Sequence, residues 1–172
     1  MRTTIIGAFC ALSACAPIAQ TSLDTWSPLE TDPAVLRAAV DLPGGVGVPK
    51  DGAVLTFGAV RQDNGQAASQ TFTLVQGQTA QGQLVFRLSD EDVAAYRTLQ
   101  RQIGAWEAAA PDATDGTFSI NVAACRMGDG PSDDAELSIF VDPGTGAGWV
   151  AVVEDAPIQD AIAMAQVLSD AC

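Results

Sequence analysis

The sequence predicts an α+β domain: a mainly antiparallel sheet of about six or seven short strands, two helices packed against it, and one disulfide. Three observations lead to this prediction. Apolar and polar residues alternate in most segments after residue 36, which is the period of half-buried strands. In two stretches the apolar spacing changes to three and four residues, the period of an amphipathic helix. Two cysteines in the second half of the chain, Cys125 and Cys172, are available for a disulfide.

The first alternating segment covers residues 36–42 and stops at Pro43-Gly44-Gly45. Because Asp32-Pro33 is also a good helix start, a strand and a short helix both remain open for this segment. Three more alternations follow, and the linkers between them, with Asp63-Asn64-Gly65 and a run of Gly and Gln, fit hairpin connections. The four apolar faces are Leu36, Ala38, Val40 and Leu42; Ala53, Leu55, Phe57 and Ala59; Phe72 and Leu74; Leu84, Phe86 and Leu88.

A helix is predicted to begin after Ser89 and to end near Pro111. Ser89 is a favourable N-cap, and the acidic residues 90–92 fall in the first turn, where negative charge suits the helix dipole. The stripe that follows predicts a face packed on the core; its members are Val93, Tyr96, Leu99, Ile103 and Trp106.

The remaining chain predicts three strands and a second helix. Alternation returns at Phe118, Ile120, Val122 and Ala124, then at Leu137, Ile139 and Val141, and again at Trp149, Ala151 and Val153. The turn residues 142–146 between the last two make a hairpin of that pair. The second helix starts near Pro157 and continues to Cys172, with the stripe Ile158, Ala161, Ile162, Ala165 and Leu168. A Cys125–Cys172 bridge would therefore clip this helix to the strand that ends at Cys125.

Length and charge limit the function classes. A chain of 172 residues, 48% of them hydrophobic, is one globular domain. After Cys15 it carries seven basic and 21 acidic residues, a net formal charge of −14. Such a surface repels nucleic-acid backbones and anionic lipid headgroups, so we expect no nucleic-acid partner. The charge also suits cationic partners or metal ions, although solubility is the simpler explanation.

The residue types present exclude much of catalysis. Histidine is absent, which removes the commonest general base and most zinc and haem sites. Lys50 is the only lysine, and the sequence contains no phosphate loop, nucleophile elbow or dinucleotide fingerprint. The glycines at 144, 146 and 148 fall in the hairpin turn and lack the helix that a nucleotide site needs. We expect no enzyme and no cofactor; a small hydrolase that uses carboxylates alone is the alternative.

The first 15 residues have the layout of a secretory signal. Arg2 precedes an apolar run, residues 5–12, that is far too short to span a bilayer. The run ends in Leu12-Ser13-Ala14-Cys15. An ordinary secreted protein or a buried N-terminal helix are the other interpretations, and both fit less well, because Pro17 and Ile18 are poor neighbours for a normal cleavage site.

The segment Leu12-Ser13-Ala14-Cys15 resembles the lipobox of bacterial lipoproteins. The resemblance implies cleavage before Cys15 and palmitate-type acylation of that cysteine, which with two or more acyl chains anchors a protein stably. Residue 16 is Ala rather than the Asp that commonly retains such proteins at the inner membrane, so the resemblance favours the outer membrane, periplasmic face. The expected division is a signal peptide (1–14), acylated Cys15 with a flexible tether (15–35), and one periplasmic domain (36–172).

The layout as a whole resembles short Gram-negative lipoproteins of unknown function. Only the lipobox is a specific motif; the other shared features are a proline-rich tether, the segment 36–43, Phe86-Arg87-Leu88-Ser89, a mid-chain cysteine and a terminal cysteine. The resemblance brings no catalytic residues. With Cys10 in the signal and Cys15 acylated, Cys125 and Cys172 remain as a pair in an oxidising compartment. Two independent buried thiols are the alternative.

The densest polar feature is the loop 129–136, which holds four carboxylates in eight residues: Asp129, Asp133, Asp134 and Glu136. These are the only candidate metal ligands, and they suggest a calcium-dependent module as an alternative function. Their spacing does not match an EF-hand, so a solvated turn between strands is the favoured interpretation and we expect no metal site.

Three tryptophans are the aromatic residues most able to anchor a partner. Trp106 and Trp149 lie on core-facing stripes, so we expect both to pack in the core. Trp26 lies in the tether, where docking on the domain, the membrane interface and contact with a partner all remain open.

Together the sequence features predict a lipid-anchored, non-catalytic lipoprotein with a binding or envelope-structural role. Its partner would be an envelope protein or another ligand that the sequence does not identify.

Overall fold

The structure is a computed structural model, and it describes residues 26–80, 82–146, 148–159, 168–169 and 172. Within these residues the chain forms eleven strands, one α-helix and one short 3-10 helix. In chain order the elements are β1 (Arg37–Asp41), β2 (Val46–Gly47), β3 (Ala53–Arg61), β4 (Ala67–Thr73), β5 (Val75–Gln78), β6 (Leu84–Arg87), α1 (Asp90–Ala109), η1 (Pro111–Ala113), β7 (Thr114–Val122), β8 (Ala124–Arg126), β9 (Glu136–Asp142), β10 (Val150–Pro157) and β11 (Leu168–Ser169).

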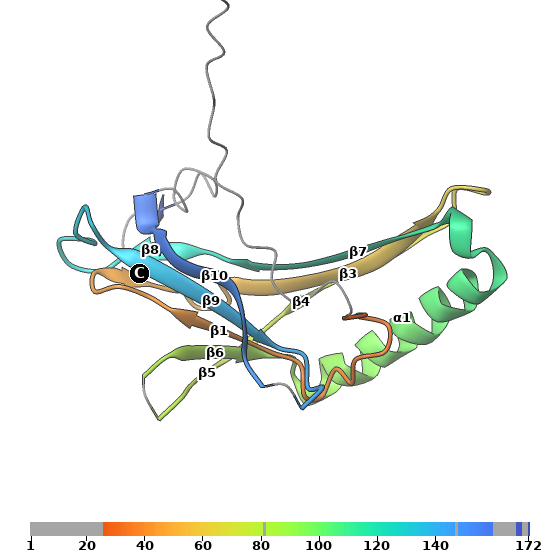
Figure 1. Ribbon diagram of the computed structural model, residues 1–172, viewed down its shortest axis with the longest axis horizontal. Coiled ribbons are helices and arrows are strands. Elements are labelled where there is room, and N and C mark those ends of the chain that lie inside the picture. The colour runs from red at the N-terminus through yellow and green to blue at the C-terminus, as the bar shows by residue number, and fades with distance from the viewer. Residues whose placement is uncertain (1–25, 81, 147, 160–167, 170–171) are drawn as a thin grey trace, which may run out of the picture.

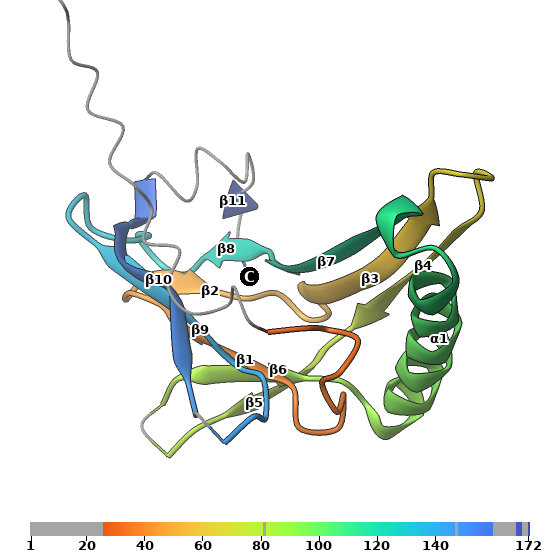
Figure 2. The same ribbon diagram turned by 45° about the vertical axis from the view of Figure 1, so that its right-hand side comes forward.

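The strands form three sheets. Sheet A has the order β10-β9-β1-β6-β5, sheet B the order β11-β8-β2, and sheet C the order β4-β3-β7 (Figure 1; β2 and β11 are labelled in Figure 2). All pairings are antiparallel except that of β11 with β8. The α+β class and the mainly antiparallel pairing are thus as predicted. The strands are more numerous than six or seven, because the predicted single sheet is divided into three and several strands are very short.

Segment 36–42, for which a strand and a short helix were both open, contains the strand β1. It lies at the centre of sheet A and pairs with β6 on one side and β9 on the other. Ala38 is buried in the main core. Ala39, which points to the opposite face, is also buried and lies in register between the larger residues Val85 and Phe140. The predicted hairpins β3–β4 and β9–β10 are both present.

Strand β5 was not predicted; residues 75–78 fell in a linker rich in Gly and Gln. The strand forms a hairpin with β6, and all four of its residues are exposed at the edge of sheet A. None of its residues is buried, so the alternation that it does carry, Val75 and Gly77 with Gln76 and Gln78, is not the clear apolar-polar pattern of a half-buried strand.

Helix α1 packs on sheet C and closes the main core. Ser89 caps it as predicted, accepting a hydrogen bond from the Asp92 N–H, and the buried residues are Val93, Tyr96, Leu99 and Ile103. The Tyr96 ring stacks on Phe57 of β3, with 4.6 Å between the ring centroids. Figure 2 shows α1 beside the ends of β3 and β4, away from β9 and β10.

The second predicted helix is described only at its start. Ile158 and Gln159 have helical backbone, and Ile158 is buried against a smaller core between sheets A and B. Residues 160–167, with Ala161, Ile162 and Ala165, lie outside the described residues. The prediction that the helix continues to Cys172 is wrong at Leu168–Ser169, which form β11 beside β8.

Residues from Trp26 onward, assigned above to the tether, lie against the domain. The Trp26 ring packs edge-on against Phe118 of β7, with 4.9 Å between the centroids. The Gln100 side-chain amide of α1 donates hydrogen bonds to the carbonyls of Pro28 and Thr31, each 2.8 Å long. We call residues 26–32 the N-terminal strap. Of the three roles open for Trp26, docking on the domain is the one observed.

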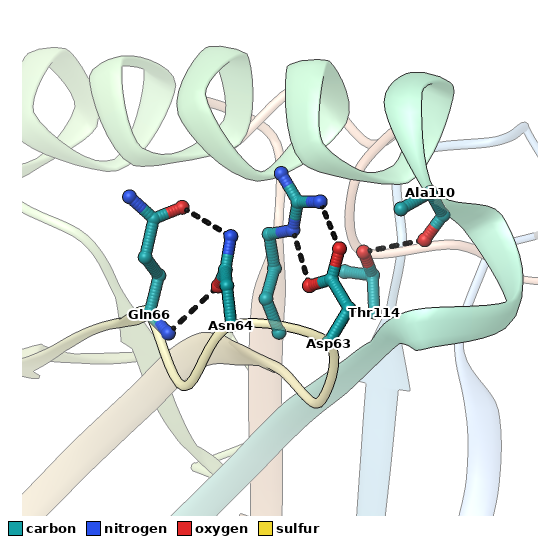
Figure 3. Close-up of polar contacts among 6 residues, drawn as sticks. Asp63, Asn64, Gln66, Ala110 and Thr114 are labelled. Atoms are coloured by element: carbon teal, nitrogen blue, oxygen red, sulfur yellow. Dashed lines mark hydrogen bonds and ion pairs between the residues drawn. The ribbon is translucent and has the colours of Figure 1, made fainter.

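The β3–β4 turn and the end of α1 lie side by side and are internally satisfied (Figure 3). The Arg61 guanidinium pairs with Asp63, and the Asn64 side chain accepts a hydrogen bond from the Gln66 N–H. Beyond α1, the Thr114 hydroxyl donates to the carbonyl of Ala110, 2.9 Å away. These polar groups form hydrogen bonds within the turn and at the end of α1, so we do not consider the region a candidate ligand site.

Candidate functional site

The predicted lipidation residue, Cys15, lies outside the described residues, as does the signal segment. No helix in the described part of the chain combines the length and the hydrophobicity that a bilayer crossing needs. The other two predicted cysteines form the disulfide Cys125–Cys172. Cys125 is fully buried in β8, whereas Cys172 is exposed, and the Cys172 N–H donates to the carbonyl of Arg126. The bridge therefore holds the end of the chain on sheet B.

The acidic loop does not gather its carboxylates. Asp129, Asp133, Asp134 and Glu136 are all exposed to solvent. Among the residues described, no three His, Cys, Asp or Glu side chains lie close enough together to hold a metal ion. The loop is organised by its backbone, with the Gly130 N–H donating to the carbonyl of Met127 and the Ala135 N–H to that of Ser132. It has the geometry of a turn between β8 and β9.

Trp149 is not a core residue, contrary to the prediction. Its side chain is 39% exposed just before β10, and the Arg37 guanidinium lies 5.1 Å from its ring centroid. Arg37 also pairs with Asp142 of β9, which is almost fully buried and accepts a hydrogen bond from the Gly144 N–H. Burial raises the pKa of the Asp142 carboxyl, but the Gly144 N–H and Arg37 lower it more, so the net pKa is below its usual value. Trp106, by contrast, is packed against the main core as predicted.

The most ligand-like hollow is an open pocket of about 460 Å³ between sheet A and strand β2. Its apolar lining comes from β1, β2, β6 and the residues next to them, and three glutamines from the β5–β6 hairpin supply amide groups. We call it the amide pocket; its lining includes Val40, Leu42, Val46, Val48, Leu84, Gln76, Gln78, Gln83, Asp41, Met127 and Cys172. Its volume falls in the range of about 300–1,000 Å³ that is usual for small-molecule sites.

The chemistry of the amide pocket limits what it can hold. Among the described residues that line it none is basic, and the lining includes Asp41. An anionic ligand would meet negative charge without a counter-charge, whereas glutamine amides both donate and accept hydrogen bonds. The pocket therefore suits an uncharged or cationic ligand with an apolar part. The sequence does contain a pattern that indicates these glutamines: Gln76 and Gln78 alternate with Val75 and Gly77 at the period of a strand, which places both glutamines on one face.

Two further hollows lie at opposite ends of the outer face of sheet A, the face that points away from the main core. One, of about 530 Å³, is lined by Arg37, Asp142, Val35 and the glycines of the β9–β10 turn. The other, of about 190 Å³, is lined by Asp41, Leu42, Pro43, Glu136, Ser138 and Asp155. The second is acidic and too small for an ordinary ligand site. Its Ser138 hydroxyl and Asp155 carboxylate are hydrogen-bonded to each other.

Comparisons with known proteins bring no further assignment. No protein-family model, curated protein or solved structure matches the chain.

Proposed function

We propose that the chain is a lipoprotein, anchored through acyl groups on Cys15 at the periplasmic face of the outer membrane, with a non-catalytic binding role. The lipobox-like segment and the apolar run before it support the anchor. The observation that carries the proposal is the Cys125–Cys172 disulfide. Such a bond persists in an oxidising compartment, and it leaves Cys10 and Cys15 as the remaining cysteines of the chain.

The binding role rests on the amide pocket. Its lining combines apolar side chains with three glutamine amides, residue types that small-molecule sites commonly combine. The ligand class is an uncharged or cationic molecule with an apolar part, as an envelope polymer fragment or an extended peptide would supply. The acidic loop and the small acidic hollow favour neither a calcium-dependent module nor a carboxylate hydrolase as a second candidate.

The anchor is tested by metabolic labelling with palmitate in a Gram-negative host. We expect the full-length chain to be labelled and to fractionate with the outer membrane, because acylation requires the Cys15 thiol. The variant Cys15→Ala should lose the label, whereas Cys10→Ala, five residues earlier in the apolar run, should keep it. A Cys15→Ala variant that is still labelled would rule out the proposal.

The binding role is tested by filling the amide pocket. In Gln76→Trp the indole enters the pocket from edge strand β5, whereas Thr73→Trp adds the same side chain at an exposed position of edge strand β4. Native mass spectrometry of the chain released gently from envelopes measures bound small molecules. We expect an adduct on the wild type and on Thr73→Trp that is lost in Gln76→Trp. An adduct of equal abundance on all three proteins places the ligand elsewhere and refutes the assignment of the pocket.

A further inference from the structure

The outer face of sheet A, which points away from the main core, is organised in three rows that cross the strands. The first row runs Val75–Arg87–Arg37–Asp142 over β5, β6, β1 and β9. The second runs Gly77–Val85–Ala39–Phe140–Ala151 and reaches β10. The third contains Asp41 and Ser138, joined by Asp155 through its hydrogen bond to the Ser138 hydroxyl. Residues in register across a sheet point to the same side, so these side chains share one face.

The first row is cationic and aromatic. The side chains of Arg37 and Arg87 are 47% and 53% exposed, and the half-exposed Trp149 lies under the Arg37 guanidinium. One terminal nitrogen of Arg37 donates a hydrogen bond to the Asp142 carboxylate. A guanidinium has five N–H donors in all, so this bond uses only part of its donor capacity. This row therefore concentrates two of the seven basic residues of the mature chain on an otherwise acidic protein.

The third row is acidic. Asp41 and Asp155 are exposed, and Glu136, further along β9 on the same side, is exposed as well. Arg37 and Asp41 stand at the two ends of β1, four residue steps or about 13 Å of extended strand apart. The face thus carries opposite charges at its two ends, with small and apolar side chains between them.

We propose that this face binds a second copy of the chain, with the two-fold axis lying along the middle row. Rotation about that axis places the middle row on itself and reverses the strands, so the Arg37 end of each copy meets the Asp41 end of the other. The interface is then self-complementary, as an isologous dimer requires. The other in-plane axis, along β1, would set Arg37 of one copy against Arg37 of the other, and like charges in contact are unfavourable.

Shape and size agree with the same arrangement. The two-fold axis brings Trp149 of one copy toward the small hollow at the acidic end of the other, where carboxylates can accept from the indole N–H. The five strands hold 28 residues in all. At about 3.3 Å a residue and about 4.8 Å between strands, they cover roughly 440 Å². Two such faces total roughly 890 Å², the size of a weak or transient interface rather than of a permanent one. The proposal does not depend on the anchor or on the amide pocket.

Site-specific cross-linking tests the geometry. Gly77 lies in the middle row, so it faces its own counterpart across the axis; sheets pack about 10 Å apart, within reach of a short bismaleimide. Gly116 of β7 is the matched control, since it is also an exposed strand glycine, and a Cβ meets little at either site. In the purified full-length chain, Gly77→Cys should give a covalent dimer and Gly116→Cys should not. Equal yields, or no dimer from Gly77→Cys, overturn the proposal.

A charge reversal tests the pairing. Asp41→Arg opposes Arg37 of the other copy, so the Gly77→Cys dimer should fall by at least about tenfold, because juxtaposed like charges cost several kcal/mol. Glu107→Arg on α1 changes the net charge equally, at an exposed position on another element, and should leave the yield unchanged. If Asp41→Arg keeps the dimer, the proposed axis is wrong. A cross-linked product whose mass is not twice that of the chain shows that another protein occupies the face, and also overturns the proposal.

Discussion

Removal of the Cys125–Cys172 disulfide should destabilise the domain by about 4 kcal/mol. The bond closes a loop with a sequence separation of 47 residues. In the chain-entropy treatment such a loop restricts the unfolded chain by about 14 cal/mol/K, which is about 4 kcal/mol at 25 °C. The native state adds to this cost, because β11 contributes only two residue pairs to β8, and its hold on sheet B depends largely on the bridge.

The assay is urea unfolding of the full-length chain and of the double variant Cys125→Ala/Cys172→Ala. Alanine is preferred to serine because Cys125 is fully buried, and a buried hydroxyl would add its own penalty. We expect a lower midpoint and, since the unfolded chain expands, a larger dependence of the unfolding free energy on urea. A loss below about 1 kcal/mol would show that the loop constrains the unfolded state far less than the entropy argument requires.

Two further predictions concern the strap and the outer face of sheet A. Trp26→Ala should lower the free energy of unfolding by about 2 kcal/mol, below the 3–5 kcal/mol of a fully buried tryptophan, because Trp26 is only partly buried against Phe118. Urea unfolding measures this difference, and an unchanged midpoint would mean that the strap does not contribute to the stability of the fold. The lowered pKa of Asp142 contributes stability above the carboxyl's ordinary pKa of 3.8 that is lost as the pH falls through the folded value. Asp142→Asn should therefore be less stable than the wild type near neutral pH and lose less stability on acidification from about pH 5 to pH 2, and parallel pH profiles of the two proteins would contradict this.

The strands with one buried face were predictable from sequence, and so was α1. Alternation in β3 works because Leu55 and Phe57 face the core while Thr56 faces outward. In α1, Ser89 and the acidic first turn mark the start, and the stripe through Tyr96 marks the buried side. In each case a local pattern and a tertiary contact favour the same structure.

The division into three sheets was not predictable, because it depends on long-range pairing. The alternation from Phe118 to Ala124 is continuous in sequence, yet β7 pairs with β3 whereas β8 pairs with β2 and β11. The change follows Ala123, whose N–H still donates to the carbonyl of Gly52 in the β3 register, before residues 124–126 pair with β2 and β11. Nothing in the residue types at that point distinguishes a bend from a straight strand.

The candidate sites were missed for a related reason. Arg37 lies 105 residues from Asp142 and more than 100 from Trp149, so the sequence alone carries no sign that the three meet. Trp149 looked like a core residue because it continues the alternation of β10, but that strand is the irregular edge of sheet A. Edge position exposes a side chain that the same pattern would bury in a central strand.

The two proposed sites lie on opposite faces of sheet A, but the amide pocket and the acidic hollow share two lining residues, Asp41 and Leu42. Asp41→Arg alone would therefore not separate loss of a ligand from loss of the dimer. Gln76→Trp separates them, because Gln76 points toward the pocket while its neighbour Gly77 points to the outer face. If the sites are independent, Gln76→Trp should lose the adduct and keep the Gly77→Cys cross-link. If Gln76→Trp loses both the adduct and the cross-link, ligand binding would be needed to hold sheet A in the form that dimerises. The adduct and the cross-link would then depend on a single site.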